Sequence, residues 1–255
     1  MARRHRYVLM RSPHRWFDVL IWPLVDCLLF GSIGVFIARQ GGTKAAAGVA
    51  YLLTGILLFH VIYQSQIAVS TGFLEETWSR NILNLMTTPL REIEYALGVA
   101  LFGLAKVAIG LTVVALAAFA FYSFDILDVG WGLLPIGALL LVCGWSISLF
   151  VIGLVLRFGQ SAEVLAWGIL FVVMPLSGVF YPISALPPLL QPIARVLPTT
   201  HLFAAARTLL DGGAMPWGQL GWALLGCVIA AILGLLYITR MLGVFRRRGF
   251  VTRFS

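Results

Sequence analysis

The sequence has very little charge. Of its 255 residues, only 11% are charged, whereas 60% are hydrophobic. A soluble core of this size does not need so many apolar residues, and several apolar runs reach the roughly 20 residues that cross a bilayer as a helix. The short alternating strands of a membrane barrel are not apparent. The composition therefore predicts an all-α, polytopic membrane protein.

Lysine is almost absent. Only Lys44 and Lys106 occur, and they follow Thr43 and Ala105. A P-loop needs a Gly-Lys-Ser/Thr sequence to hold phosphates, so we expect no P-loop in this chain. If the protein does work, the energy must come from ions or from a partner.

Enzyme and metal motifs are also lacking. Cys27, Cys143 and Cys227 lie in apolar runs without metal-ligand spacing, so we expect small buried hydrophobic residues. The zinc motif H-E-x-x-H is absent, and Pro175 stands where an intramembrane serine protease needs glycine before its serine. We therefore expect no catalytic residue, metal or cofactor in the chain itself.

Six long apolar runs organise the sequence. They are about Val19–Ala38, Ala46–Ser70, Tyr95–Tyr122, Leu133–Leu156, Val164–Tyr181 and Trp217–Tyr237. Six spans place both termini on one side of the membrane. Arginines cluster at both ends of the chain, which favours a cytoplasmic location for the termini over nucleic-acid binding.

Residues 182–215 differ from the spans, because five prolines occur by Pro198. The pieces LPPLLQPIARVL and TTHLFAAARTLL are apolar but too short to cross a bilayer. They predict outer re-entrant half-helices, with a packed extracytoplasmic loop as the alternative. Thr199 or Thr200 is expected to cap the second piece.

Residues 72–90, GFLEETWSRNILNLMTTPL, interrupt the apolar runs with charge. On a helix over 73–86, one face is apolar and the rest carries charged residues. The apolar face comprises Leu74, Trp78, Ile82 and Leu85, and the remainder includes Glu75, Glu76 and Arg80. Two adjacent acids suit an anionic membrane surface poorly, so the pattern favours a docking surface for a protein over a plain connector.

Few ionisable residues lie inside the predicted spans. Asp26 and Lys106 are expected to form a buried structural pair, which we favour over a proton relay. His60, Tyr63 and Gln64 form a polar patch on the second span, which either lines a pathway or makes hydrogen bonds between helices.

Glycines recur every seven residues in several runs, as at Gly48 and Gly55. This spacing keeps them on one helix face. It predicts close helix packing.

The order of these features resembles a known family. Gly72–Glu76 opens an acidic amphipathic segment that ends in Thr88-Pro89-Leu90, and Tyr181-Pro182 begins the outer segment LPPLLQPIARVLPTTHLFAAAR. Together with the arginine-rich N-terminus and the six spans, they resemble the permease subunits of type-two ATP-binding-cassette exporters. The resemblance covers nearly the whole chain, as one permease domain over 1–255.

The resemblance implies roles for particular segments. Residues 1–18 would include an interfacial gate helix with Arg15, Trp16, Phe17 and Asp18. Residues 71–90 would contain the cytoplasmic coupling helix, 182–215 the outer re-entrant helices, and 238–255 a basic cytoplasmic tail. The polar face of the second span, with Ser177 and Tyr181 of the fifth, would line the conduit.

The resemblance also implies partners. Two separate ATPase subunits would dock on the permease and bind ATP and magnesium, and a second copy of the chain would complete a homodimer in the cytoplasmic (inner) membrane. The cargo is expected to be a glycolipid, a lipid-linked glycan or a hydrophobic drug. Two rival hypotheses are a stand-alone ion-coupled transporter that uses Asp26, His60 and Lys106, and a membrane assembly factor that transports nothing.

Overall fold

The computed structural model describes residues 20–41, 45–78 and 92–248, and within these ranges the chain forms helices and no strand. This confirms the predicted all-α class. The elements are α3 (Trp22–Gly41), α4 (Ala45–Trp78), α6 (Glu92–Tyr122), η3 (Ile126–Val129), α7 (Leu133–Phe158), η4 (Gly159–Ala162), α8 (Val164–Leu176), η5 (Ile183–Ala185), α9 (Gln191–Val196), α10 (Pro198–Leu210) and α11 (Trp217–Arg248).

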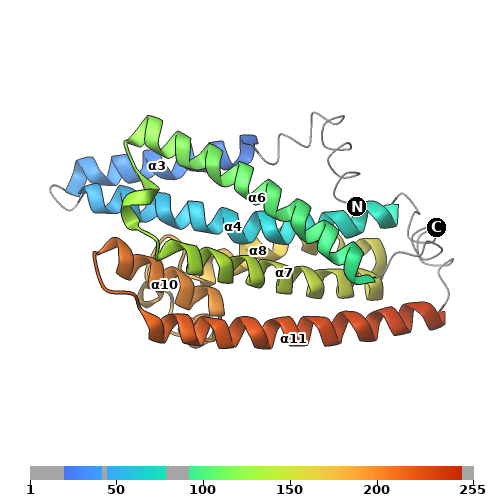
Figure 1. The fold of residues 1–255 in the computed structure, drawn as a ribbon. Coiled ribbons are helices and arrows are strands. Elements are labelled where there is room, and N and C mark those ends of the chain that lie inside the picture. Colours follow the sequence, from blue (N-terminus) through green and yellow to red (C-terminus); the bar gives the residue numbers. More distant parts are fainter. Residues whose placement is uncertain (1–19, 42–44, 79–91, 249–255) are drawn as a thin grey trace.

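Helix α4 is the centre of the bundle. Five helices in the described ranges are long and apolar enough to cross a membrane, namely α3, α4, α6, α7 and α11. Of the span in α4, 89% is buried inside the protein, against 17% of the span in α11. Figure 1 shows α3, α6 and α7 running alongside α4. Polar side chains on α4 are therefore surrounded by protein, which is where membrane helices tolerate them.

The bundle has two distinct ends. Helices α4, α7 and α11 all finish at one end, which we name the Trp78 end, whereas η3 and α10 lie at the opposite end, the α10 end (Figure 1). Asp125 at the α10 end caps η3 by accepting a hydrogen bond from the Leu127 amide at 2.8 Å. At the Trp78 end, α7 stops at Gly159, whose φ of 74° suits glycine.

The fifth predicted span is shorter than expected. Helix α8 has 13 residues and is therefore only about 20 Å long, against roughly 30 Å of hydrocarbon. The helix contains Pro175 and stops at Leu176, two residues before Gly178, which has a φ of 62°. The predicted range Val164–Tyr181 thus includes a turn beyond the helix. The described ranges hold five candidate spans, and the count of six stays a prediction.

The second predicted span is longer than expected. The prediction ended it at Ser70 and began a separate helix at 73, but α4 continues without a break to Trp78. Leu74 explains the continuation, because its side chain is 1% exposed and packs in one cluster with Val155 and Ala166. Packing against α7 and α8 holds this last part of α4 in line with the span.

The segment 182–215 contains two helices at the predicted places, α9 and α10, but the predicted cap is wrong. Leu197 is the N-cap of α10, it makes no side-chain cap bond, and Pro198 occupies the first turn. Proline suits that position because its missing N–H would have no helical partner there. Thr199 and Thr200 therefore lie inside the helix, and their hydroxyl groups bond elsewhere.

Candidate functional site

The predicted docking segment lies only partly within the described residues. Leu74 is buried against the subunit's own α7 and α8, so it is not presented to a partner in this conformation. Glu75 is half-exposed at the Trp78 end. The side chains of Glu76, Trp78, Arg80, Ile82 and Leu85 lie outside the described residues, as do Arg15, Trp16, Phe17 and Asp18 of the predicted gate helix.

Gln66 links α4 to α8 and lies shortly before the predicted docking segment in the sequence. Its Nε2 donates to the Ala166 carbonyl at 3.1 Å and to Ser70 Oγ at 3.0 Å. Ser148 Oγ of α7 donates to the Gln66 carbonyl at 2.8 Å. Gln66 and Leu74 thus both hold the beginning of α8 against α4. The sequence alone does not predict the contact of Gln66 with α8, although Gln66 and Ser70 lie four residues apart on the second predicted span.

The polar patch predicted on the second span is packed inside the subunit. His60 and Gln64 are both buried, and Tyr63 is half-buried. The Tyr63 ring meets the His60 ring edge-on, with 6.2 Å between centroids and 88° between planes. These residues do come together, but in this conformation His60 and Gln64 do not face an open channel.

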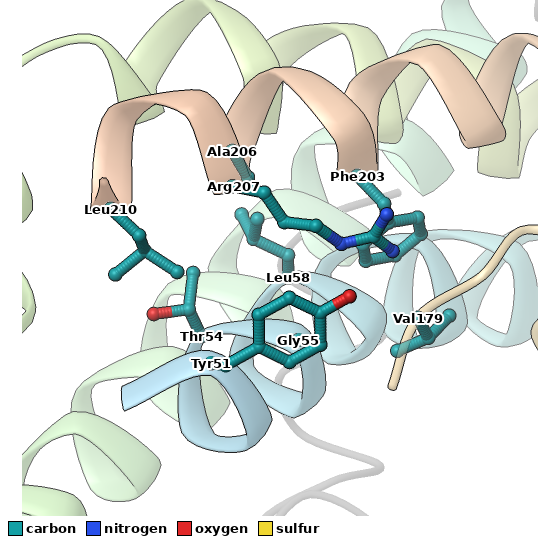
Figure 2. A pocket seen from close by; sticks show the side chains of 9 residues that line it. All are labelled: Tyr51, Thr54, Gly55, Leu58, Val179, Phe203, Ala206, Arg207 and Leu210. Carbon is teal, nitrogen blue, oxygen red and sulfur yellow. The ribbon is translucent and has the colours of Figure 1, made fainter. Parts of the chain in front are cut away.

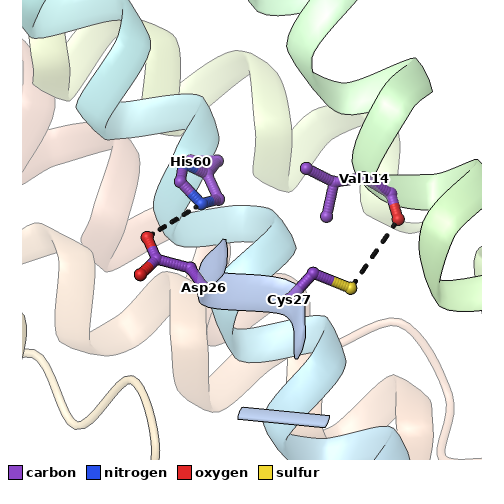
Figure 3. Close-up of polar contacts among 4 residues, drawn as sticks. All are labelled: Asp26, Cys27, His60 and Val114. Atoms are coloured by element: carbon purple, nitrogen blue, oxygen red, sulfur yellow. Dashed lines mark hydrogen bonds and ion pairs between the residues drawn. The ribbon is translucent and has the colours of Figure 1, made fainter. Parts of the chain in front are cut away.

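Asp26 contacts His60. Oδ2 of Asp26 on α3 lies 3.3 Å from Nε2 of His60 on α4 (Figure 3). The distance is that of an ion pair, but neither ring nitrogen of His60 has the alignment of a hydrogen bond. The two groups are therefore in close contact without a hydrogen bond, and they form an ion pair only when His60 is protonated. The pairing of Asp26 with Lys106 stays a prediction.

A second polar cluster closes the α10 end. Ser177 Oγ and Thr199 Oγ1 are 2.6 Å apart, and Thr200 Oγ1 donates to the Leu176 carbonyl at 3.4 Å. Tyr181 donates its hydroxyl to the Pro175 carbonyl at 3.1 Å. Ser177 and Tyr181, both predicted to line the conduit, thus fasten the end of α8, and the bonds of Ser177 and Leu176 tie it to α10.

Arg207 of α10 completes this cluster. Its Nη2 donates to the Tyr181 carbonyl at 3.1 Å, and its guanidinium carbon lies 5.0 Å from the centroid of the Tyr51 ring on α4. Burial lowers the pKa of the Arg207 guanidinium, while the adjacent Tyr51 hydroxyl opposes that shift. An arginine remains charged at any physiological pH, so a cation sits between α4, α10 and the turn after α8.

Two glycines allow the turn after α8 to pack closely, one against α4 and one against its own backbone. A Cβ on Gly55 would lie 2.5 Å from the Val179 carbonyl oxygen, and one on Gly178 would lie 2.8 Å from the Tyr181 carbonyl oxygen. Next to the contact is a small cavity of about 10 Å³, room for roughly one water. Figure 2 shows its lining, which is Tyr51, Thr54, Gly55, Leu58, Val179, Phe203, Ala206, Arg207 and Leu210.

The cysteines are buried, as expected. Cys143 of α7 and Cys227 of α11 meet, with 2.6 Å between their sulfur atoms, and Cys27 approaches the Val114 carbonyl at 4.0 Å. Across the described residues, no group of three or more His, Cys, Asp or Glu side chains is arranged to hold a metal ion.

Comparison with known proteins agrees with this architecture. The model of the ABC-2 type transporter family matches residues 6–210. The chain is also 23% identical over 198 residues to the inner membrane transport permease YadH of Escherichia coli (strain K12), covering 75% of each chain, and equally to that of Shigella flexneri. The matched residues include the central helix α4, the α8 turn and the outer helices α9 and α10. The chain belongs to the ABC-2 type transporter family, and it is a membrane-spanning permease subunit of an ABC transporter.

Proposed function

We propose that this permease exports an amphipathic cargo across the cytoplasmic membrane, driven by a separate ATPase that docks at the Trp78 end. The family match over residues 6–210 carries the proposal, because membership of this family implies an ABC ATPase partner. A glycolipid, a lipid-linked glycan or a hydrophobic drug has the required amphipathic character.

The path from the docking end to the outer end runs through α8. ATP binding in the partner would move the end of α4, and Leu74 and Gln66 would carry this motion to the beginning of α8. The other end of α8 is tied to α10 through Ser177 and Thr199. A push at the Trp78 end would therefore shift the outer helices, which is how inward-facing and outward-facing states would interconvert.

The proposed topology has both termini in the cytoplasm. It needs α8, which follows η4 after the end of α7, and the turn after α8 to bring the chain back to the α10 end. Arg157 ends α7 at the Trp78 end, and arginines close α11 at the same end. Both agree with a cytoplasmic Trp78 end by the positive-inside rule.

The proposed assembly contains two copies of this chain and two ATPase subunits. Large apolar side chains on α3, α8 and α11 are exposed, as Phe36, Phe171 and Leu236 illustrate. Such surface suits lipid and also a second copy of the chain. A conduit between the copies would require Tyr63 and Tyr181 to be near that boundary, and both are at least partly exposed.

The decisive test is the response of a partner ATPase. The candidate partner is a neighbouring gene product with the G-x-x-x-x-G-K-[ST] motif, reconstituted with the permease in liposomes. We expect the intact permease to bind the ATPase and change its turnover, and Glu75→Arg with Glu76→Arg to abolish both effects. The matched control reverses two exposed acids at the α10 end, Asp128→Arg with Asp211→Arg, and should behave as the intact protein.

One observation favours a second candidate, an ion-coupled transporter. The Asp26–His60 contact places two ionisable groups together within candidate spans, as a proton pathway requires. A stand-alone transporter of this kind would need no ATPase and would tolerate charge reversal at Glu75, and membership of the ABC-2 type transporter family argues against it. An ATPase that binds the intact protein but not the charge-reversed one would eliminate it.

A further inference from the structure

One face of α3 is exposed along its whole length. The exposed apolar side chains on this face include Trp22, Val25, Leu29, Ile33 and Phe36. Their spacing of three and four residues makes one continuous stripe on the helix. This stripe lies within a candidate span, so it offers an apolar surface long enough for an acyl chain.

Asp26 borders this stripe. It follows Trp22 by four residues, so the two side chains are neighbours on the helix surface. The Asp26 side chain is 29% exposed, and Trp22 is 53% exposed. An ionisable group inside a span normally faces a cavity or pathway, because lipid solvates charge poorly. The exposed part of the Asp26 carboxylate beside this apolar stripe would be stabilised by a cationic partner on the same side of α3.

His60 fixes the direction of the carboxylate. Its Nε2 lies 3.3 Å from Oδ2 of Asp26, and the His60 side chain is only 3% exposed. Figure 3 shows the second carboxylate oxygen directed away from the imidazole, while the neighbouring Cys27 points to the opposite side, toward Val114. One oxygen thus lies beside the imidazole, and the other points away from it.

The combination of an indole and a carboxylate has a specific chemistry. Ammonium groups bind over tryptophan faces, and an adjacent carboxylate adds an attractive charge. An anionic head group would instead be repelled by Asp26. Beside an apolar stripe, these two residues suit an amphiphile with a positively charged head.

We propose that Trp22 and Asp26 form a binding site for the cationic head group of an amphiphile, with His60 as the positioning residue for Asp26. As a statement about cargo, this rests on the proposed export function and narrows its cargo to cationic amphiphiles. The binding itself requires no ATPase, so the two proposals fail independently.

The test measures binding to the full-length permease in micelles of a non-ionic maltoside detergent, which carries no cationic head group. The probes are two pyrene-labelled amphiphiles with the same tail, one ending in trimethylammonium and the other in carboxylate. We expect the ammonium probe to bind about tenfold more tightly than the carboxylate probe. Equal affinity of the two probes would overturn the proposal.

Matched variants locate the site. Asp26→Asn should remove the preference for the ammonium probe, whereas Asp128→Asn removes the same charge at the α10 end and should keep it. Trp22→Leu should weaken the ammonium probe, and Trp131→Leu, which changes a tryptophan that is 86% exposed, should not. If each variant behaves like its control, the probe binds elsewhere and the assignment is wrong.

His60 is tested by rescue. His60→Gln keeps a polar group near the position of Nε2 and should retain the ammonium preference, whereas His60→Leu should lose it. If the histidine were purely structural, the pattern would differ. His60→Leu would then weaken the binding of both probes and leave the ratio of their affinities unchanged. If the intact permease failed to bind the ammonium probe but still changed the turnover of the ATPase, only the binding site would be refuted. If it bound the probe but did not change the turnover, only the ATPase-driven function would be refuted.

Discussion

At the scale of single residues, identical positions in a sequence repeat have different surroundings. Gly48 and Gly55 of α4 are seven residues apart and were both predicted to permit close packing. A Cβ on Gly55 would meet the Val179 backbone, but a Cβ on Gly48 would meet nothing within 4 Å. The repeat predicts which face of the helix is small, and the turn after α8 determines which glycine is required.

The first prediction follows from this difference. Gly55→Ala should destabilise the permease by about 1–3 kcal/mol, because a backbone carbonyl cannot move aside as a flexible side chain does. Gly48→Ala on the same helix should be neutral or stabilising by up to about 1 kcal/mol, since alanine favours helix. Melting temperatures of the purified proteins measure both effects, and an equal decrease in the two variants would contradict the close approach.

The sequence predicts some residues of the candidate site, but not which of them are in contact. The sequence singled out Asp26 and His60 as rare ionisable residues within spans, but it suggested Lys106 as the partner of Asp26. Charge alone favours that choice. The structure places His60 beside Asp26, because α3 and α4 pack against each other along their length. Which spans are neighbours is a property of the tertiary fold, and no local pattern contains it.

At the scale of elements, the long apolar runs were predicted well, but the ends of α4, α8 and α11 were not. Helix α11 continues past the predicted end at Tyr237 to Arg248, into the segment predicted as a basic tail. Apolar length alone identifies α3, α6, α7 and α11. The end of α4 depends on Leu74, which packs against other helices and extends the span to Trp78. The end of α8 depends on the turn at Gly178, which is hidden in an apolar run up to Tyr181.

The outer segment supplies the second prediction, which belongs to the scale of elements. Arg207 holds α10 to the turn after α8 through the Tyr181 carbonyl, and it contacts α4 through Tyr51. Arg207→Gln should loosen the whole segment, so backbone amides over 178–210 should exchange with deuterium several-fold faster. The measurement is hydrogen exchange with mass spectrometry on the purified permease.

Arg195 provides the control for this experiment. It is an exposed arginine on α9 whose Nη2 reaches only Gln191 Oε1, at 3.5 Å. Arg195→Gln removes the same charge from the same segment and should change exchange near α9 alone. If the two variants gave the same exchange pattern, Arg207 would be no more than a surface charge.

At the scale of the whole molecule, the short helix α8 decides the topology. Five long helices alone would leave the ends of the chain on opposite sides of a membrane. The proposed sixth crossing would combine α8 with the non-helical turn at 177–182. Such irregular backbone is tolerated at membrane depth only where protein covers it, and the cluster of Ser177, Thr199 and Arg207 provides that cover.

The last prediction tests this arrangement in intact cells. The three native cysteines are buried, so the unmodified protein should not react with a membrane-impermeant maleimide. Asp128→Cys and Asp211→Cys place exposed thiols at the α10 end, and Arg157→Cys places one at the Trp78 end. We expect the first two to be labelled in intact cells and Arg157→Cys only after permeabilisation. Labelling of Asp128→Cys but not of Asp211→Cys would mean that α8 fails to return the chain to the outer side, and the proposed topology would be wrong.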